Sequence, residues 1–184
     1  MNVRQLRIPI SCFVGFFALV NWSLCALEAK TFTHKKAGVQ VFLPDYWGVQ
    51  DKGGVIVTSP RDGSLLLLFG IVPQSSLQQA LKELDKQLLD FVKVPRIEGE
   101  PVQLVINGMC GFSVGASGEI EGKKVEISVM LLDTKAPTIF LVLGIGEKGK
   151  FEKHVPVVKQ ILGTLHGTLQ PSCQGKPIPK LPPG

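Results

Sequence analysis

The chain has 184 residues and a formal net charge of +5, from 20 basic and 15 acidic side chains. That length suits one domain with its own hydrophobic core, because chains with two domains usually need more residues. Charged residues make up 19% of the sequence, which argues against a long disordered chain or a coiled coil. The positive charge is mild and aromatic residues make up only 7%, so we expect no nucleic-acid partner.

The first 29 residues have the pattern of a secretory signal peptide. Arg4 and Arg7 precede a charge-free apolar run over residues 8–27, and small residues follow near its end. We expect cleavage near Ala29, and cleavage after residue 25 or 26 fits nearly as well. The protein is therefore predicted to be exported, to the periplasm or to the extracellular space.

Two alternatives for this segment stay open. Residues 8–27 are nearly long enough to span a bilayer, so an uncleaved anchor is one reading, although Pro9 and Asn21 dilute the run. A membrane contact is expected only if this segment is retained. Lipidation of Cys25 is the other reading, but Leu24 stands where lipoprotein signals have a small residue.

Cleavage at Ala29 would leave Cys110 and Cys173 as the cysteines of the mature chain. Because exported proteins form disulfides, one bond between these two residues is possible. Two separate thiols, Cys110 buried and Cys173 exposed, are the alternative.

The first half of the mature chain predicts three strands and a helix. Strands are expected at residues 39–43, 55–59 and 64–72, because each is rich in β-branched or apolar residues and turn residues separate them. Apolar residues at helical spacing then predict an amphipathic helix over residues 77–92. Ser76 and Gln79 form a capping box at its start.

The second half predicts four strands and a closing helix. The strands are expected at residues 102–106, 112–116, 125–132 and 138–145. The helix covers roughly residues 151–165, and since Pro156 is tolerated only near a first turn, it can begin as late as Val155.

The predicted order is therefore β-β-β-α-β-β-β-β-α. Tight turns make neighbouring strands antiparallel, and strands that are apolar on both faces need helices on each side. We expect an α+β fold, with an antiparallel sheet of about seven strands covered by helices on both faces. The domain is assigned to residues 30–168, and residues 169–184, which are rich in proline, to a disordered tail.

Ser113 lies in a GxSxG sequence, residues 111–115, the pattern of a hydrolase nucleophile elbow. That elbow needs a strand, a sharp turn and then a helix, whereas the residues around Ser113 predict strand and hairpin. We expect a strand serine, and keep a small secreted hydrolase that uses Ser113 as the alternative.

A second pattern, GxGxxG at residues 144–149, suggests phosphate binding in a βαβ unit. No further strand follows the last helix, so we interpret these glycines as a connection. The histidines and cysteines share no metal-ligand spacing, and we expect no catalytic residue, no cofactor and no metal.

Two surface features could meet a ligand or a partner. Tyr46 and Trp47 follow the first predicted strand, where Trp47 either plugs the end of the core or lines a pocket. A basic cluster at the new N-terminus, Lys30, Lys35 and Lys36 with the adjacent histidine, could meet an anionic lipid or polymer, although ordinary solvation is the simpler interpretation.

Residues 38–47 (GVQVFLPDYW), the hairpin over residues 58–72 and the closing segment over residues 151–165 together resemble the PsbP/DcrB group, which is similar to the Mog-type α/β/α sandwich. The resemblance covers residues 32–165 and implies an antiparallel sheet between helices. The group includes photosystem subunits, bacterial envelope proteins and a GTPase partner, and it implies no shared catalytic motif. This chain lacks the transit region of a photosystem subunit.

The sequence thus predicts an exported, non-catalytic binding or assembly protein of the cell envelope, with an unknown protein or small molecule as its partner. The alternatives are the Ser113 hydrolase and an assembly factor anchored by residues 8–27.

Overall fold

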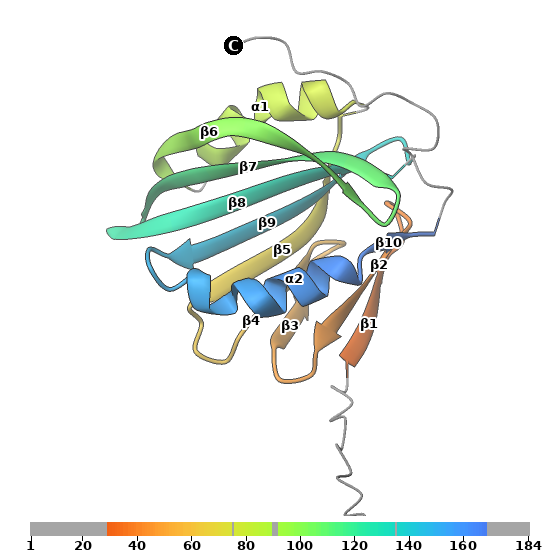
Figure 1. Cartoon of the computed structure of the whole chain (residues 1–184), viewed down its shortest axis with the longest axis horizontal. Coiled ribbons are helices and arrows are strands. Elements are labelled where there is room, and N and C mark those ends of the chain that lie inside the picture. The colour runs from red at the N-terminus through yellow and green to blue at the C-terminus, as the bar shows by residue number, and fades with distance from the viewer. Residues whose placement is uncertain (1–28, 75, 90–91, 135, 169–184) are drawn as a thin grey trace, which may run out of the picture.

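The computed structural model describes residues 29–74, 76–89, 92–134 and 136–168 (Figure 1). Within these residues the chain forms a seven-stranded antiparallel sheet of order β3-β4-β5-β9-β8-β7-β6 and a three-stranded sheet of order β1-β2-β10. The strands are β1 (Ala29–His34), β2 (Val39–Pro44), β3 (Gly48–Asp51), β4 (Ile56–Ser59), β5 (Leu65–Val72), β6 (Lys93–Ile106), β7 (Met109–Ile120), β8 (Lys123–Asp133), β9 (Ile139–Glu147) and β10 (His166–Gly167). The helices are α1 (Leu77–Leu89), the 3-10 turn η1 (Glu152–His154) and α2 (Val155–Gly163).

The three middle strands of the large sheet, β5, β9 and β8, are apolar on both faces. Successive side chains of a strand point to opposite faces, so each of these strands supplies two hydrophobic cores. On β5, for example, Phe69 lies in one buried cluster and Leu68 packs against the other. A sheet of this kind is stable only when both faces are covered.

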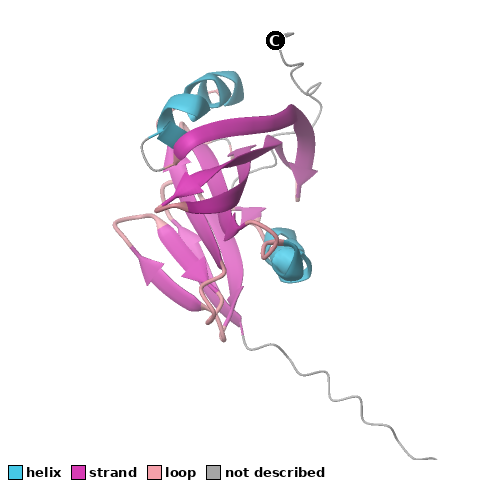
Figure 2. Cartoon of the chain, turned by 90° about the vertical axis from the view of Figure 1, so that its left-hand side faces the viewer, coloured by secondary structure: helices cyan, strands magenta, loops and turns pink. Residues whose placement is uncertain are grey.

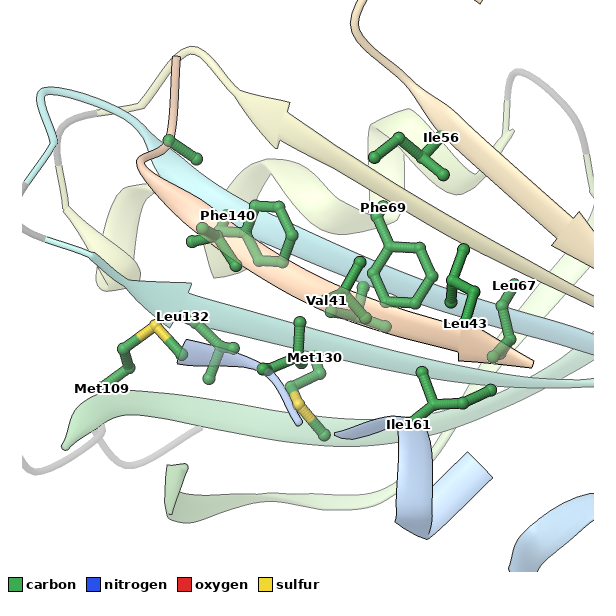
Figure 3. Packing of buried hydrophobic residues seen from close by; sticks show 14 of the residues in the cluster. Val41, Leu43, Ile56, Leu67, Phe69, Met109, Met130, Leu132, Phe140 and Ile161 are labelled. Carbon is green, nitrogen blue, oxygen red and sulfur yellow. The ribbon is translucent and has the colours of Figure 1, made fainter. Parts of the chain in front are cut away.

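The small sheet and α2 cover one face. Val41 and Leu43 of β2 pack against Phe69 and Phe140 of the large sheet, and Ile161 of α2 closes the same cluster (Figure 3). The rings of Phe69 and Phe140 stack within this layer, with their planes inclined by 24° and their centroids 6.4 Å apart.

Helix α1 covers the opposite face, so that the two helices flank the large sheet (Figure 2). Leu77 and Ala80 of α1 are buried against a cluster that includes Phe112 and Val129. The Oγ atom of Ser76 accepts a hydrogen bond of 3.3 Å from the backbone N–H of Gln79, as the predicted cap requires.

The predicted fold class is confirmed: an antiparallel sheet of seven strands lies between helices. The membership of the strands differs from the prediction, because residues 39–43 pair in the small sheet and the short edge strand β3 takes their place in the large one. Strands β1, β3 and β10 were not predicted, since they are short or mostly exposed and lack an apolar alternation.

Strand β6 begins at Lys93, well before the predicted residue 102. This early part was not predicted because it contains Pro95, Gly99 and Pro101, which are unfavourable in strands. An edge strand tolerates such residues at bulges. The last helix begins at Val155, the later of the two predicted starts, with Pro156 in its first turn.

The predicted signal segment and the predicted tail, residues 1–28 and 169–184, lie outside the described residues. Ala29, next to the predicted cleavage site, is the first residue of β1. Among the described residues, no helix combines the length and the apolar character that crossing a bilayer demands.

Candidate functional site

A pocket of about 360 Å³ lies between two turns, residues 35–38 and residues 52–55, which join β1 to β2 and β3 to β4. One turn comes from the small sheet and the other from the large one, so the pocket bridges the two sheets. It is lined by Thr33, His34, Lys35, Lys36, Asp51, Gly53, Gly54 and Ile56.

His34 holds the two turns together. Its side chain is buried, with 5% of its surface exposed. The Nδ1 atom accepts a hydrogen bond of 3.2 Å from the N–H of Ala37, so the ring proton lies on Nε2 and is donated to the carbonyl oxygen of Gly54 at 2.6 Å. The ring also meets Phe140 edge-on, with centroids 5.6 Å apart. His34 is therefore a fixed, neutral wall of the pocket.

The second turn is shaped by its own hydrogen bonds. The Oδ1 atom of Asp51 accepts from the N–H of Gly54 at 3.1 Å, and the N–H of Lys52 donates to the carbonyl oxygen of Val55 at 2.9 Å. Gly53 and Gly54 have φ values of +69° and +93°, a backbone conformation that favours glycine. The pocket is thus framed on this side by a turn that two hydrogen bonds close.

Two lysines of the pocket have no carboxylate partner among the described residues. Lys35 and Lys36 are exposed at its rim, and in the part of the chain that the structure describes no carboxylate lies within ion-pair distance of either ammonium. Asp51 is the acid in the lining, and it bonds to backbone instead. Two lysines beside a preformed pocket can bind an anionic group.

A second cluster joins the turn between β4 and β5 to the start of α2. The Oγ atom of Ser64 lies 2.6 Å from Oδ1 of Asp62 and 2.6 Å from Nε2 of His154. The Nζ atom of Lys153 donates to Oδ2 of Asp62 at 2.6 Å. The bonds from Lys153, and then those from Ser64, hold the pKa of the Asp62 carboxyl well below its usual range.

This serine, histidine and aspartate are arranged differently from a nucleophile triad. Since ionised Asp62 only accepts, the hydroxyl proton of Ser64 points to it and His154 donates its Nε2 proton to Oγ. A nucleophilic serine instead needs a histidine that accepts its proton, oriented by a carboxylate on the opposite ring nitrogen. Here Asp62 lies on the Nε2 side, 3.9 Å from that atom. The geometry fits a structural tie.

Trp47 belongs to the core. It has 4% of its surface exposed and packs edge-on to His154, with centroids 6.2 Å apart. Tyr46 is 42% exposed, so the predicted contact with a ligand or partner stays a prediction for Tyr46.

Ser113 lies within β7, opposite Val102 of β6 and Met130 of β8. The strand continues through it from Met109 to Ile120, so the turn and helix of a nucleophile elbow are absent at this described site.

The glycines of the GxGxxG sequence make room for a ring. Gly144 and Gly146 lie in β9, and a Cβ atom on them would stand 3.3 Å and 2.9 Å from ring carbons of Phe151. Close packing therefore explains the first two glycines, and the third, Gly149, lies in the following turn with a φ of +78°.

Cys110 is disulfide-bonded. Cys173, its predicted partner, lies outside the described residues, so the pairing stays a prediction. Within the described ranges, no three His, Cys, Asp or Glu side chains are grouped to hold a metal ion.

Comparison with known proteins matches the fold, although no family model and no curated protein sequence matches the chain. CyanoP, the cyanobacterial PsbP of Synechocystis sp. PCC 6803, aligns with a TM-score of 0.55 and 9% identity, over 79% of this chain and 95% of that one. LpqN of Mycobacterium tuberculosis, described as involved in cell envelope biogenesis, aligns with a TM-score of 0.51 and 14% identity, over 75% and 89% of the two chains. PA94 of Pseudomonas aeruginosa, a protein of unknown function described as a putative regulator, gives 0.51 and 12%, over 74% and 94%.

The chain has the PsbP-like fold. The resemblance inferred from residues 38–47, 58–72 and 151–165 is confirmed at the level of architecture. At these identities the likeness concerns the fold alone.

Sequence reasoning found part of the pocket and missed the rest. The basic cluster that it noted supplies Lys35 and Lys36, whereas Asp51 and the glycines of the opposite turn were not singled out. The spacing of Asp62 and Ser64 was a usable signal for the second cluster, because an aspartate often bonds to the residue two positions on.

Proposed function

We propose that this chain is an exported, non-catalytic binding protein of the cell envelope, and that its pocket takes the anionic group of a ligand. The observation that carries this proposal is the pair Lys35 and Lys36, two cations without a described carboxylate partner at the rim of a pocket framed by His34. A phosphate or a carboxylate group would complete the charge. Export rests on the pattern of residues 1–29.

The second cluster supports the non-catalytic part of the proposal. Asp62 with its depressed pKa is a poor base, and the hydroxyl of Ser64 is already directed to it. Ser113 lies mid-strand. The involvement of LpqN in cell envelope biogenesis is compatible with an envelope role, but it belongs to that protein.

Binding is tested by isothermal titration of the mature chain with inorganic pyrophosphate and with citrate, and by sedimentation with vesicles of phosphatidylglycerol or phosphatidylcholine. We expect binding to a free anion or to the anionic vesicles, weakened about tenfold or more in the Lys35→Ala/Lys36→Ala variant. The matched control, Lys123→Ala/Lys124→Ala, removes the same charge from the start of β8 and should bind as the parent does. Equal weakening in both variants would reduce the effect to net charge, and the proposal would fail.

The remaining parts of the proposal have their own tests. Intact mass of protein purified from the envelope reports whether residues 1–29 are removed, and a chain beginning at Met1 would favour the anchored alternative. An esterase activity that is lost in Ser113→Ala, with the fold intact, would establish the hydrolase alternative instead.

A further inference from the structure

Strand β1 is an edge of the small sheet, and among the described strands it pairs with β2 alone. Its register with β2 is regular from Ala29 to His34, and its sequence holds no proline and no glycine. Prolines, glycines and bulges are features that keep an edge strand from accepting a further strand. The side chains of Thr31 and Thr33 are exposed on it. The backbone of β1 is therefore suited to pair once more.

The hydrogen bonds of β2 show which backbone groups of β1 face outward. The N–H of Phe42 in β2 donates to Oγ1 of Thr164 at 3.0 Å, and Thr164 precedes β10, which pairs with β2 on the side away from β1. Residues opposite each other in an antiparallel pair alternate between bonded and non-bonded positions, so Thr31, opposite Phe42, makes no ladder bond to β2. Thr33, two residues on, has the same orientation. Within the described ranges, the outward N–H and C=O groups of Thr31 and Thr33 have no hydrogen-bond partner.

This open edge leads into the pocket with the two lysines at its rim. Thr33 belongs to the pocket lining, and Lys35 and Lys36 follow the last residue of β1. The turn at residues 52–55 borders the pocket on the other side. A strand laid along β1 would therefore have one of its ends beside Lys35 and Lys36.

The charge around the edge indicates its occupant. Lys30, Lys35 and Lys36 have no carboxylate within ion-pair distance among the described residues. A second copy of the chain, paired through β1, would bring these lysines close to their own counterparts, and like charges oppose such pairing. Residues 169–184 contain two lysines and no acidic residue, so the chain's own tail is no better matched. An acidic segment of another protein is electrostatically complementary.

We propose that β1 is a docking edge for an extended, acidic peptide segment of a partner protein. The segment adds to β1 as a further strand of the small sheet, bonds to the backbone of Thr31 and Thr33, and directs an Asp or Glu side chain at its end into the pocket at Lys35 and Lys36. Main-chain hydrogen bonds supply affinity in this mode, and side chains supply specificity. The inference rests on the proposed function, since it names the ligand that the pocket takes.

The test is selection of peptides from a random phage-displayed library against the mature chain, tail included, followed by fluorescence anisotropy with the selected peptide. We expect alternating β-branched sequences with an acidic residue at one end. Thr31→Pro should weaken the selected peptide about tenfold or more, because proline removes an N–H that the peptide needs and β2 does not use. For the same reason its thermal melting should stay close to that of the parent. The conservative variant Thr31→Val keeps the N–H and should retain the parent's affinity.

Methylation of the peptide's own amides tests strand addition without changing the protein. In a strand that is added at an edge, alternate N–H groups face the sheet and the others face away from it. N-methylation of one alternate set should therefore abolish binding, and N-methylation of the other set should leave it intact. Equal effects of the two sets, or a Thr31→Pro variant that binds the peptide as tightly as the parent, would overturn the docking edge.

The lysine variants separate this inference from the proposed function. Lys35→Ala/Lys36→Ala should weaken the selected peptide about tenfold, and Lys123→Ala/Lys124→Ala should not. If pyrophosphate binding depends on Lys35 and Lys36 but no peptide is selected, the docking edge fails and the anion pocket stands. If neither pyrophosphate nor any selected peptide depends on these two lysines, the proposed function fails as well. A dimer that Thr31→Pro dissociates would assign the edge to a second copy and contradict the acidic partner.

Discussion

Histidine joins distant segments of this molecule at two places, and the two junctions differ in what they leave free. His34 is buried and ties the turn at residues 35–38 to the turn at residues 52–55 by a neutral hydrogen bond to backbone. His154 is half-buried and ties the β4–β5 turn to the start of α2 through Ser64.

The lysines beside the two histidines show the contrast. Lys153, next to His154, forms an ion pair with Asp62, so the positive charge at the second junction is neutralised. Lys35 and Lys36, next to His34, have no such acid among the described residues. A histidine with a neighbouring lysine thus forms a charge-neutral contact at one place. At the other it borders a pocket whose lysines have no described acidic partner, which is why we assign binding to the His34 pocket.

Replacing each histidine by alanine gives the largest expected difference. His34→Ala leaves the buried N–H of Ala37 without a partner, breaks the part-buried bond to the carbonyl oxygen of Gly54 and removes packing on Phe140, so it should lower the free energy of unfolding by about 3 kcal/mol. His154→Ala should lower it by about 1 kcal/mol, because water can reach its partners. Urea denaturation of both variants measures the two free energies of unfolding. Equal decreases would show that the two junctions do not differ in this way.

Removing the charge of Asp62 should change the stability of the fold by less, and by an amount that depends on pH. Because the folded pKa of Asp62 is depressed, its contribution to stability is present above its unfolded pKa of about 3.9 and is lost as the pH falls further. We therefore expect Asp62→Asn to be less stable than the parent at neutral pH and to converge with it in acid. Urea midpoints against pH, at low and high salt, measure this.

The control for that experiment is Asp45→Asn, an exposed aspartate elsewhere on the surface. Its midpoint should follow the parent at every pH. If the urea midpoints of Asp62→Asn and the parent differ by the same amount down to acid pH, the assigned ion pair is contradicted.

The turns that carry these junctions could be predicted locally, whereas their partners could not. The dipeptide Asn107-Gly108 and the segment from Pro60 to Gly63 signal turns through residues that tolerate positive φ, and the structure has both. Nothing local says that the amide of Asn107 reaches the end of α2, because that contact depends on how the hairpin packs.

Which strands are buried could be predicted from local sequence, whereas which charged residues pair could not. Apolar periodicity assigned β5 and β9 to a covered sheet, since periodicity is a property of the sequence itself. The pairing of Lys153 with Asp62 joins residues 91 positions apart, and the pocket needs two hairpins to meet. The candidate site therefore emerges only from the tertiary arrangement.

The exposed ion pair between Glu147 and Lys150 should contribute least to stability. Removing it tests why the ion pair of Asp62 contributes more. The Nζ atom of Lys150 lies 2.7 Å from Oε2 of Glu147, nearly as close as Lys153 lies to Asp62, and Lys150 lowers the pKa of Glu147. These residues are three positions apart, however, so their contact restrains one local connection and joins no distant segments. We expect Glu147→Gln to leave the urea midpoint unchanged within error at neutral pH. A loss as large as that of Asp62→Asn would mean that the charge itself, rather than the distance in sequence that it bridges, sets the contribution of these surface ion pairs.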